Sequence, residues 1–135
     1  MQKPDFSGLW RFNPARSVLQ TPPPDATVFI IEHDEPRLHI SRTHVAGGTQ
    51  DTFTIDLMTD GREVRLEHRG AQLSARAFWD DEILAFDTTL VRGGEEGANT
   101  VRYALAPDRK SFVAQERFRS RSLNYDNTWV MDKVP

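Results

Sequence analysis

Apolar and polar residues alternate along almost the whole chain, and this period of two constrains the fold more than any other feature. Segments such as TVFIIEH and TVRYAL place every second side chain on the same face of an extended strand. Almost no part of the chain shows the period of about 3.6 residues that an amphipathic helix requires. The pattern predicts an all-β protein with ten strands, at 6–12, 27–33, 37–45, 51–58, 63–68, 72–79, 83–91, 100–105, 111–118 and 124–131.

Short turn signals separate these segments at regular intervals. Residues that favour tight reversals stand at Asp34-Glu35-Pro36, Gly47-Gly48, Asp60-Gly61, Gly70-Ala71, Asp80-Asp81, Gly93-Gly94 and Pro107-Asp108. Such spacing is typical of a single antiparallel up-and-down (meander) barrel, here of about 8–10 strands. The exception is PARSVLQTPPPD at 14–25, where three consecutive prolines predict a long proline-rich loop. The 135 residues fit one domain, 1–135.

Hairpin register tests this barrel, because directly opposed residues share one face of a sheet. A turn at Gly47-Gly48 sets Leu38 against Leu57, and a turn at Asp60-Gly61 sets Leu57 against Val64. Each hairpin then places its apolar side chains on one continuous face, which predicts the barrel interior. The other opposed pairs that we expect include His68 with Leu73, Ala77 with Leu84, and Leu105 with Phe112.

The two ends of the predicted barrel differ. We expect a closed, dry end where the tight turns meet apolar layers, at 34–36, 60–61, 80–81 and 107–110. The proline-rich loop and the connections 93–99 and 119–124 fall at the other end, which we expect to be open.

Polar side chains gather inside the layers near the open end. Three interpretations fit them: a structural network in which Glu116 pairs with Arg42 or reaches Asn127, recognition of a ligand, or acid–base catalysis. In the second, Arg42 or His68 holds a polar head while aromatic side chains hold an apolar body. In the third, Glu116 or His68 moves a proton. The inward polar positions are Arg42, His44, His68, Thr88, Tyr103, Glu116, Tyr125 and Asn127.

Gly8-Leu9-Trp10 matches the G-x-W motif of the lipocalin and calycin superfamily. Together with the proline-rich loop and the segments IIEHDEPRLHISRT and AFWDDEILAF, it makes the chain resemble small bacterial lipocalin-like domains of mostly unassigned function. The resemblance implies a barrel with Trp10 at the closed end and the loop near the open mouth. Ten strands depart from the eight of true lipocalins and are closer to fatty-acid-binding or nitrobindin-like barrels. Lipocalins also place a late arginine over this tryptophan, and no arginine of this chain is assigned to that position.

The leading hypothesis is binding of a small, largely hydrophobic ligand with a polar or acidic end inside the barrel. Families of this kind mostly bind small hydrophobic molecules. The alternative is a cofactor-free enzyme, an isomerase, lyase (hydratase) or cyclase, with Glu116 and His68 as catalytic residues. The expected ligand-binding residues are Arg42, His44, Phe53, His68, Phe86, Thr88, Tyr103, Glu116, Tyr125, Asn127 and Trp129.

The composition of the chain limits the kinds of partner and cofactor that we expect it to bind. The net charge of −3 gives no basic field for nucleic acid, and no apolar run approaches the ~20 residues of a membrane span. The chain has no cysteine, and its four histidines form no metal motif, so we expect no metal. We also expect no cofactor, with haem bound through His68 or His44 as the less favoured alternative.

The sequence also bears on the oligomeric state of the protein and on its cellular compartment. Phe29, Ile31 and Phe78 are expected to face outward, where an apolar patch would support a homodimer through the outer sheet face. As written, the N-terminus carries no signal peptide, so we expect a soluble cytoplasmic protein, or an exported one if a signal peptide was removed.

Overall fold

The structure is a computed structural model that describes residues 3–135, and within that range every regular element is a strand. Ten of the strands coincide with the ten alternating segments, and β2 is an additional short strand inside the proline-rich loop. The strands are β1 (Gly8–Phe12), β2 (Val18–Leu19), β3 (Ala26–Asp34), β4 (Arg37–Ala46), β5 (Thr49–Met58), β6 (Val64–His68), β7 (Ala71–Asp80), β8 (Ile83–Arg92), β9 (Glu95–Leu105), β10 (Ser111–Ser120) and β11 (Asn124–Lys133).

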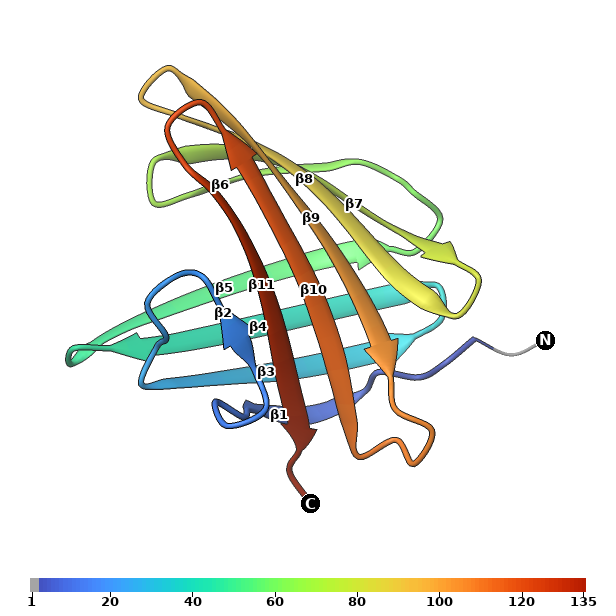
Figure 1. Ribbon diagram of the computed structural model, residues 1–135. Coiled ribbons are helices and arrows are strands. Elements are labelled where there is room, and N and C mark those ends of the chain that lie inside the picture. Colours follow the sequence, from blue (N-terminus) through green and yellow to red (C-terminus); the bar gives the residue numbers. More distant parts are fainter. Residues whose placement is uncertain (1–2) are drawn as a thin grey trace.

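The strands form one antiparallel sheet in the order β5-β4-β3-β1-β11-β10-β9-β8-β7-β6. The first and last long strands pair directly, with Trp10 opposite Lys133 and Phe12 opposite Met131. This pairing curls the sheet, so that β3–β5 and β7–β11 wrap around a common interior (Figure 1). The predicted all-β up-and-down barrel is therefore confirmed.

The barrel is not hydrogen-bonded all the way round, because β5 and β6 lie at the two edges of the sheet. The predicted hairpin at Asp60-Gly61 is wrong: Val64 pairs with Ala75 of β7 and not with Leu57. The Gly61 N–H donates to the carbonyl of Ala77 at 2.8 Å, so this turn is bonded to β7 before the chain enters β6.

Side chains hold the two edges together at both ends. At the closed end, the Glu35 carboxylate accepts hydrogen bonds from Thr59 Oγ1 (2.7 Å) and Trp79 Nε1 (3.0 Å). Toward the open end, Asp51 Oδ1 lies 2.8 Å from Arg69 Nε, which joins β5 to the turn after β6. We call the Asp51–Arg69 pair the open-end clasp.

The hairpins at Gly47-Gly48 and Pro107 have the predicted register, with Leu38 opposite Leu57 and Leu105 opposite Phe112. Two other hairpins are shifted by two residues. His68 opposes Ala71 rather than Leu73, and Ala77 opposes Phe86 rather than Leu84. An even shift leaves each side chain on its predicted face, because faces alternate with every residue.

Strand β3 is the one whose predicted faces are wrong. Asp34 pairs with Arg37, so the turn contains only Glu35 and Pro36 and not residues 34–36. The odd difference turns Phe29 and Ile31 inward, opposite Arg42 and Ile40.

Because the faces of β3 are reversed, the expectations about its outward-facing residues are wrong. Ile31 is buried in the core, and Phe29 packs against it, so the proposed outer apolar patch lacks two of its three members. Phe78 does face outward, where it packs beneath the guanidinium groups of Arg76 and Arg102. His33 of the same strand is buried and donates from Nε2 to Glu35 at 2.9 Å.

The closed end carries the densest core. Trp10 and Phe112 are both fully buried and meet edge-to-face with ring centroids 4.8 Å apart. Trp10 Nε1 donates to the Phe6 carbonyl at 2.9 Å. Lys133 Nζ lies 5.6 Å from the Trp10 ring centroid, so a lysine of the last strand stands over the motif tryptophan. Gly8 has a φ of +144°, a backbone conformation that L side chains rarely adopt, which explains the motif glycine.

The proline-rich loop lies along β11, because β2 pairs with Asn127 and Thr128. Asn127 anchors it by accepting from Gln20 N (2.7 Å) and donating to Thr21 Oγ1 (3.0 Å).

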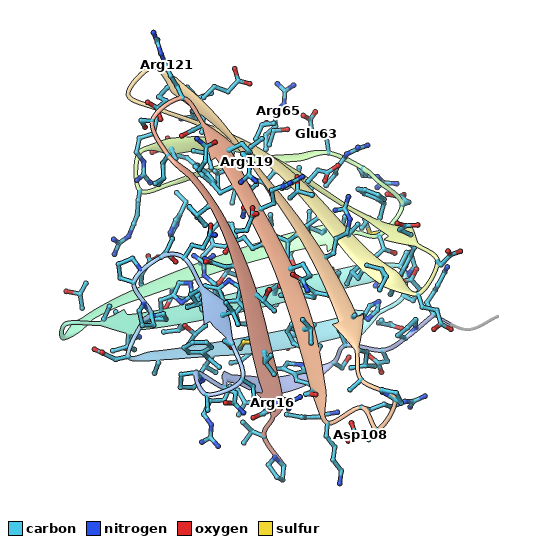
Figure 2. All side chains as sticks on the ribbon, viewed as in Figure 1. Arg16, Glu63, Arg65, Asp108, Arg119 and Arg121 are labelled. Carbon is cyan, nitrogen blue, oxygen red and sulfur yellow. The ribbon has the colours of Figure 1, made fainter. Side chains whose placement is uncertain are left out.

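The outer surface is charged. Side chains such as Glu63, Arg65 and Arg121 point away from the barrel (Figure 2). Arg117 and Arg119 both lie against Asp126. None of the described residues forms a helix that is long and apolar enough to cross a membrane.

Candidate functional site

The barrel interior contains a cavity of about 280 Å³, which we call the main compartment. Its wall is mostly apolar because β3–β9 turn alternate Phe, Ile, Leu and Val side chains inward. A few polar side chains interrupt the wall. The polar lining residues are Arg42, His68, Thr88, Asn99 and Tyr103.

A second cavity of about 110 Å³ adjoins it, which we call the polar compartment. Arg42, Asn99 and Tyr103 line both cavities, so the two meet at these side chains. The polar compartment also touches His44, Glu116 and Trp129. A largely apolar space thus opens onto a small space rich in hydrogen-bonding groups.

Arg42 is the principal charge at this junction. Its Nε is buried and has no hydrogen-bond partner among residues 3–135. Asp51 is its ion-pair partner, with Nη2 and Oδ2 3.8 Å apart, and its guanidinium lies 5.3 Å from the Phe53 ring centroid. Burial lowers the pKa of Arg42, while the charge of Asp51 opposes that shift. The side chain as a whole is 32% exposed, but a guanidinium with one buried, unpartnered N–H favours an incoming anion.

Glu116, by contrast, is fully engaged. Its carboxylate accepts hydrogen bonds from Trp129 Nε1 (2.9 Å), Asn127 Nδ2 (3.2 Å) and Asn99 Nδ2 (3.1 Å). This arrangement is the structural network considered for Glu116, but its partners are three neutral donors rather than Arg42. The carboxylate therefore organises the surrounding side chains.

His44 lies on the far side of Arg42. Its Nδ1 is 2.5 Å from Thr27 Oγ1, and its ring stacks on Trp129 at a centroid distance of 5.9 Å. Burial, followed by the charge of Arg42, lowers the pKa of His44 to about 4. His44 is thus neutral near pH 7.

His68 lines the main compartment near the open end. Its Nε2 lies 3.3 Å from Asp51 Oδ1 without hydrogen-bond geometry, and its ring meets Phe53 edge-to-face. His68 and Glu116 do not share a compartment, which separates the two residues of the enzyme hypothesis. Haem binding through His68 or His44 stays a prediction.

The two tyrosines differ in position. Tyr103 is buried at the junction, where burial raises the pKa of its hydroxyl above the ordinary value. Tyr125 stacks on Phe118 and lines neither compartment. Burial, with a smaller contribution from the charge of Glu116, raises the pKa of Tyr125 to about 12.

Most of the expected ligand-binding side chains line one of the compartments. Phe53, Phe86 and Thr88 face the main compartment, and Trp129 faces the polar one. Asn127 and Tyr125 line neither compartment. The Asn127 side chain bonds to the proline-rich loop and to Glu116.

Sequence reasoning missed two lining residues, Phe29 and Asn99. Phe29 was missed through the wrong face of β3. Asn99 was missed because the strand was expected to begin at Thr100, whereas β9 begins at Glu95. The signal was the Gly93-Gly94 pair, a two-residue hairpin turn that extends the alternation of inward side chains back to Asn99.

A further hollow adjoins the main compartment at the open end. This hollow, of about 560 Å³, lies between the end loops and is lined by Arg92, Glu95 and Leu123, among others. His68, Leu73 and Leu90 line both spaces, so these side chains stand between the main compartment and the hollow.

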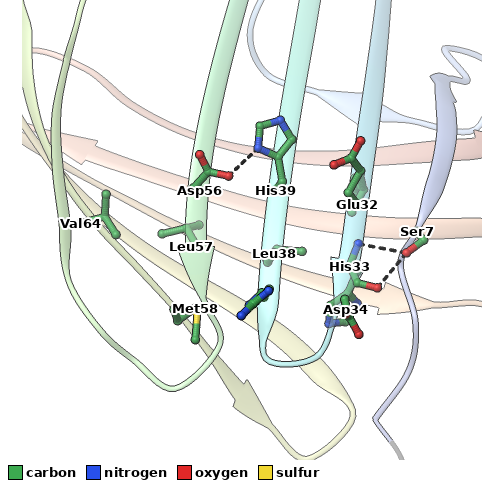
Figure 3. Close-up of a pocket in the computed structure, with 12 residues that line it drawn as sticks. Ser7, Glu32, His33, Asp34, Leu38, His39, Asp56, Leu57, Met58 and Val64 are labelled. Atoms are coloured by element: carbon green, nitrogen blue, oxygen red, sulfur yellow. Dashed lines mark hydrogen bonds and ion pairs between the residues drawn. The ribbon is translucent and has the colours of Figure 1, made fainter.

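Another hollow, of about 640 Å³, opens beside β3–β5 near the closed end (Figure 3). Its polar groups bond to one another: His39 Nδ1 lies 2.5 Å from Asp56 Oδ1, and Ser7 Oγ bonds to both backbone groups of His33. The barrel interior is the better candidate site, because that is where buried groups lack partners.

No protein-family model and no curated protein matches this sequence. Solved structures do match it over almost the whole chain. Secretory abundant heat soluble protein 4 of Ramazzottius varieornatus is 17% identical, with a TM-score of 0.62 over 100% of this chain and 99% of that one. A zebrafish ileal bile acid-binding protein complexed with cholic acid is 12% identical, with a TM-score of 0.60 over 96% and 98%. Human cRBP IV is 11% identical, with a TM-score of 0.59 over 93% and 97%.

At such low identity the likeness establishes the fold alone. The chain has a lipocalin-like, calycin-type barrel with two adjoining compartments inside it.

Proposed function

We propose that this protein binds a small, largely hydrophobic molecule whose acidic end meets Arg42 inside the barrel. The observation that carries the proposal is the Arg42 guanidinium, which stands in a mostly apolar cavity with a buried and unpartnered Nε. A buried N–H without an acceptor costs about 1–3 kcal/mol, and a half-buried guanidinium also gains from a nearby negative charge. A ligand carboxylate supplies both.

The shape of the site supports an amphipathic ligand. The main compartment gives an apolar body contact with Phe53, Phe86 and Ile55. Its volume of about 280 Å³ is near the lower end of the ~300–1,000 Å³ range of small-molecule sites, which favours a compact ligand. The fold also occurs in a zebrafish protein complexed with cholic acid, which agrees with binding of an amphipathic acid.

Calorimetric titration with octanoate, decanoate and dodecanoate, each matched with its alcohol, tests the proposal. We expect the acids to bind and Arg42→Met to weaken them at least about tenfold while the alcohols change little. Arg65→Met, on the outer surface, is the control and should bind like the parent protein. Acid binding unaffected by Arg42→Met would contradict the proposal.

The enzyme alternative gains no specific support, because Glu116 is held by three donors and His68 lies in the other compartment. It stays a prediction that a turnover assay on Glu116→Gln would address.

A further inference from the structure

The polar compartment shows which hydrogen bonds a ligand must supply. Most of its polar groups already have partners: Glu116 accepts three hydrogen bonds, and His44 Nδ1 contacts Thr27 Oγ1. Two buried atoms at the junction have none among residues 3–135, namely Arg42 Nε and Asn99 Oδ1. One is a donor and the other is an acceptor.

The orientation of the Asn99 amide follows from its neighbour. Its Nδ2 lies 3.1 Å from Glu116 Oε2, and a carboxylate oxygen accepts hydrogen bonds, so the NH₂ group must face Glu116. The opposite orientation would place two acceptors against each other. The Asn99 carbonyl oxygen is therefore directed away from Glu116 and left without a donor.

The same residues line both compartments, so a ligand head that reaches the junction meets both unpartnered atoms. Arg42 requires an acceptor, best an anion, whereas Asn99 requires a donor. A plain carboxylate satisfies only Arg42, because it has no hydrogen to give. A cationic donor such as an ammonium group is disfavoured beside the Arg42 charge.

We propose that the ligand is a hydroxy acid: an apolar chain whose carboxylate meets Arg42 and whose nearby hydroxyl donates to Asn99 Oδ1. This inference rests on the proposed function and deepens it. The polar compartment, of about 110 Å³, has room for about three waters, and a bound hydroxyl would replace one of them at Asn99.

Titration of the parent protein with decanoate, α-hydroxydecanoate and β-hydroxydecanoate tests the inference, because the chains are matched and only the hydroxyl differs. We expect at least one hydroxy acid to bind roughly tenfold more tightly than decanoate, as a buried acceptor gains its donor. Asn99→Leu should abolish that preference, so that the three acids bind this variant with equal affinity.

Thr89→Val is the control. Thr89 is exposed on the outer face of β8 and lines neither compartment, so this variant should keep the preference.

The outcomes separate the two proposals. Equal affinity of the parent protein for all three acids would overturn the hydroxy-acid inference and leave the proposed function standing. Binding of none of the acids would overturn the proposed function itself. Preference retained in a folded Asn99→Leu would refute the role of Asn99. If that variant does not fold, the comparison of the three acids on the parent protein still decides.

Discussion

Acidification should destabilise the protein through His44. The residue is half-buried between Thr27 and Trp129, and burial together with the Arg42 charge lowers its pKa to about 4. In the unfolded chain the imidazole titrates near its ordinary value of 6.5. The folded state therefore holds the neutral form over a range in which the unfolded state takes up a proton.

The sign and size follow from proton linkage. Between about pH 6.5 and pH 4 the unfolded chain binds more protons at His44, so the free energy of unfolding falls as the pH falls. The full window corresponds to at most about 3 kcal/mol. Because the ring is partly open to the cavity, we expect roughly 1–2 kcal/mol. Below pH 4 this contribution stays constant.

Urea unfolding at a series of pH values, on the parent protein and on His44→Gln, measures the effect. Gln is neutral at every pH in the series and can still bond to Thr27, so its stability should fall less between pH 6.5 and 5. His39→Gln, outside the barrel beside Asp56, is the control. Equal slopes for the parent protein and His44→Gln would refute the reasoning, as would an NMR titration of His44 with a midpoint near pH 6.5.

Two further predictions concern the network and the clasp. Glu116→Ala removes the acceptor of three partly buried donors and should lower the free energy of unfolding by roughly 1–3 kcal/mol in urea titrations, whereas the exposed neighbour variant Gln115→Ala should change it by less than about 1 kcal/mol. A smaller loss for Glu116→Ala would mean that water replaces the carboxylate. Arg69→Gln removes the open-end clasp to Asp51 and should change stability by less than about 1 kcal/mol while speeding ligand dissociation in stopped-flow experiments. An unchanged dissociation rate would exclude the β5/β6 edge from the path of the ligand.

The barrel could be predicted because alternation and turns agree over most of the chain. At Gly47-Gly48 and Pro107 the turn length fixes the pairing, and the predicted registers are those of the structure. In two other hairpins the register is shifted by two residues, and every side chain still lies on its predicted face, because side-chain direction has a period of two.

Turn length was also the main source of error. A difference of one residue at Glu35-Pro36 reversed every side chain of β3, including Phe29. At Asp60-Gly61 the local signal favoured a hairpin, but Gly61 bonds to Ala77 and β6 pairs with β7. The closure of a barrel depends on all its strands together, so a single turn dipeptide cannot predict it.

The candidate site was predictable only as a set of inward positions. The alternation placed Arg42 and Glu116 inside, but not their partners. The partners depend on rotamers and on strand curvature. Glu116 bonds to Trp129, Asn127 and Asn99, and Arg42 Nε is left without a partner. Those details distinguish a structural carboxylate from a guanidinium whose Nε has no partner, and only the three-dimensional structure shows them.

A crystal structure of the protein with bound decanoate would show whether Arg42 holds the acidic end of the ligand. We expect the carboxylate within hydrogen-bond distance of Arg42 Nε and the chain between Phe53 and Phe86 in the main compartment. A carboxylate at the open end with no contact to Arg42, or a chain bound outside the barrel, would contradict the proposed function.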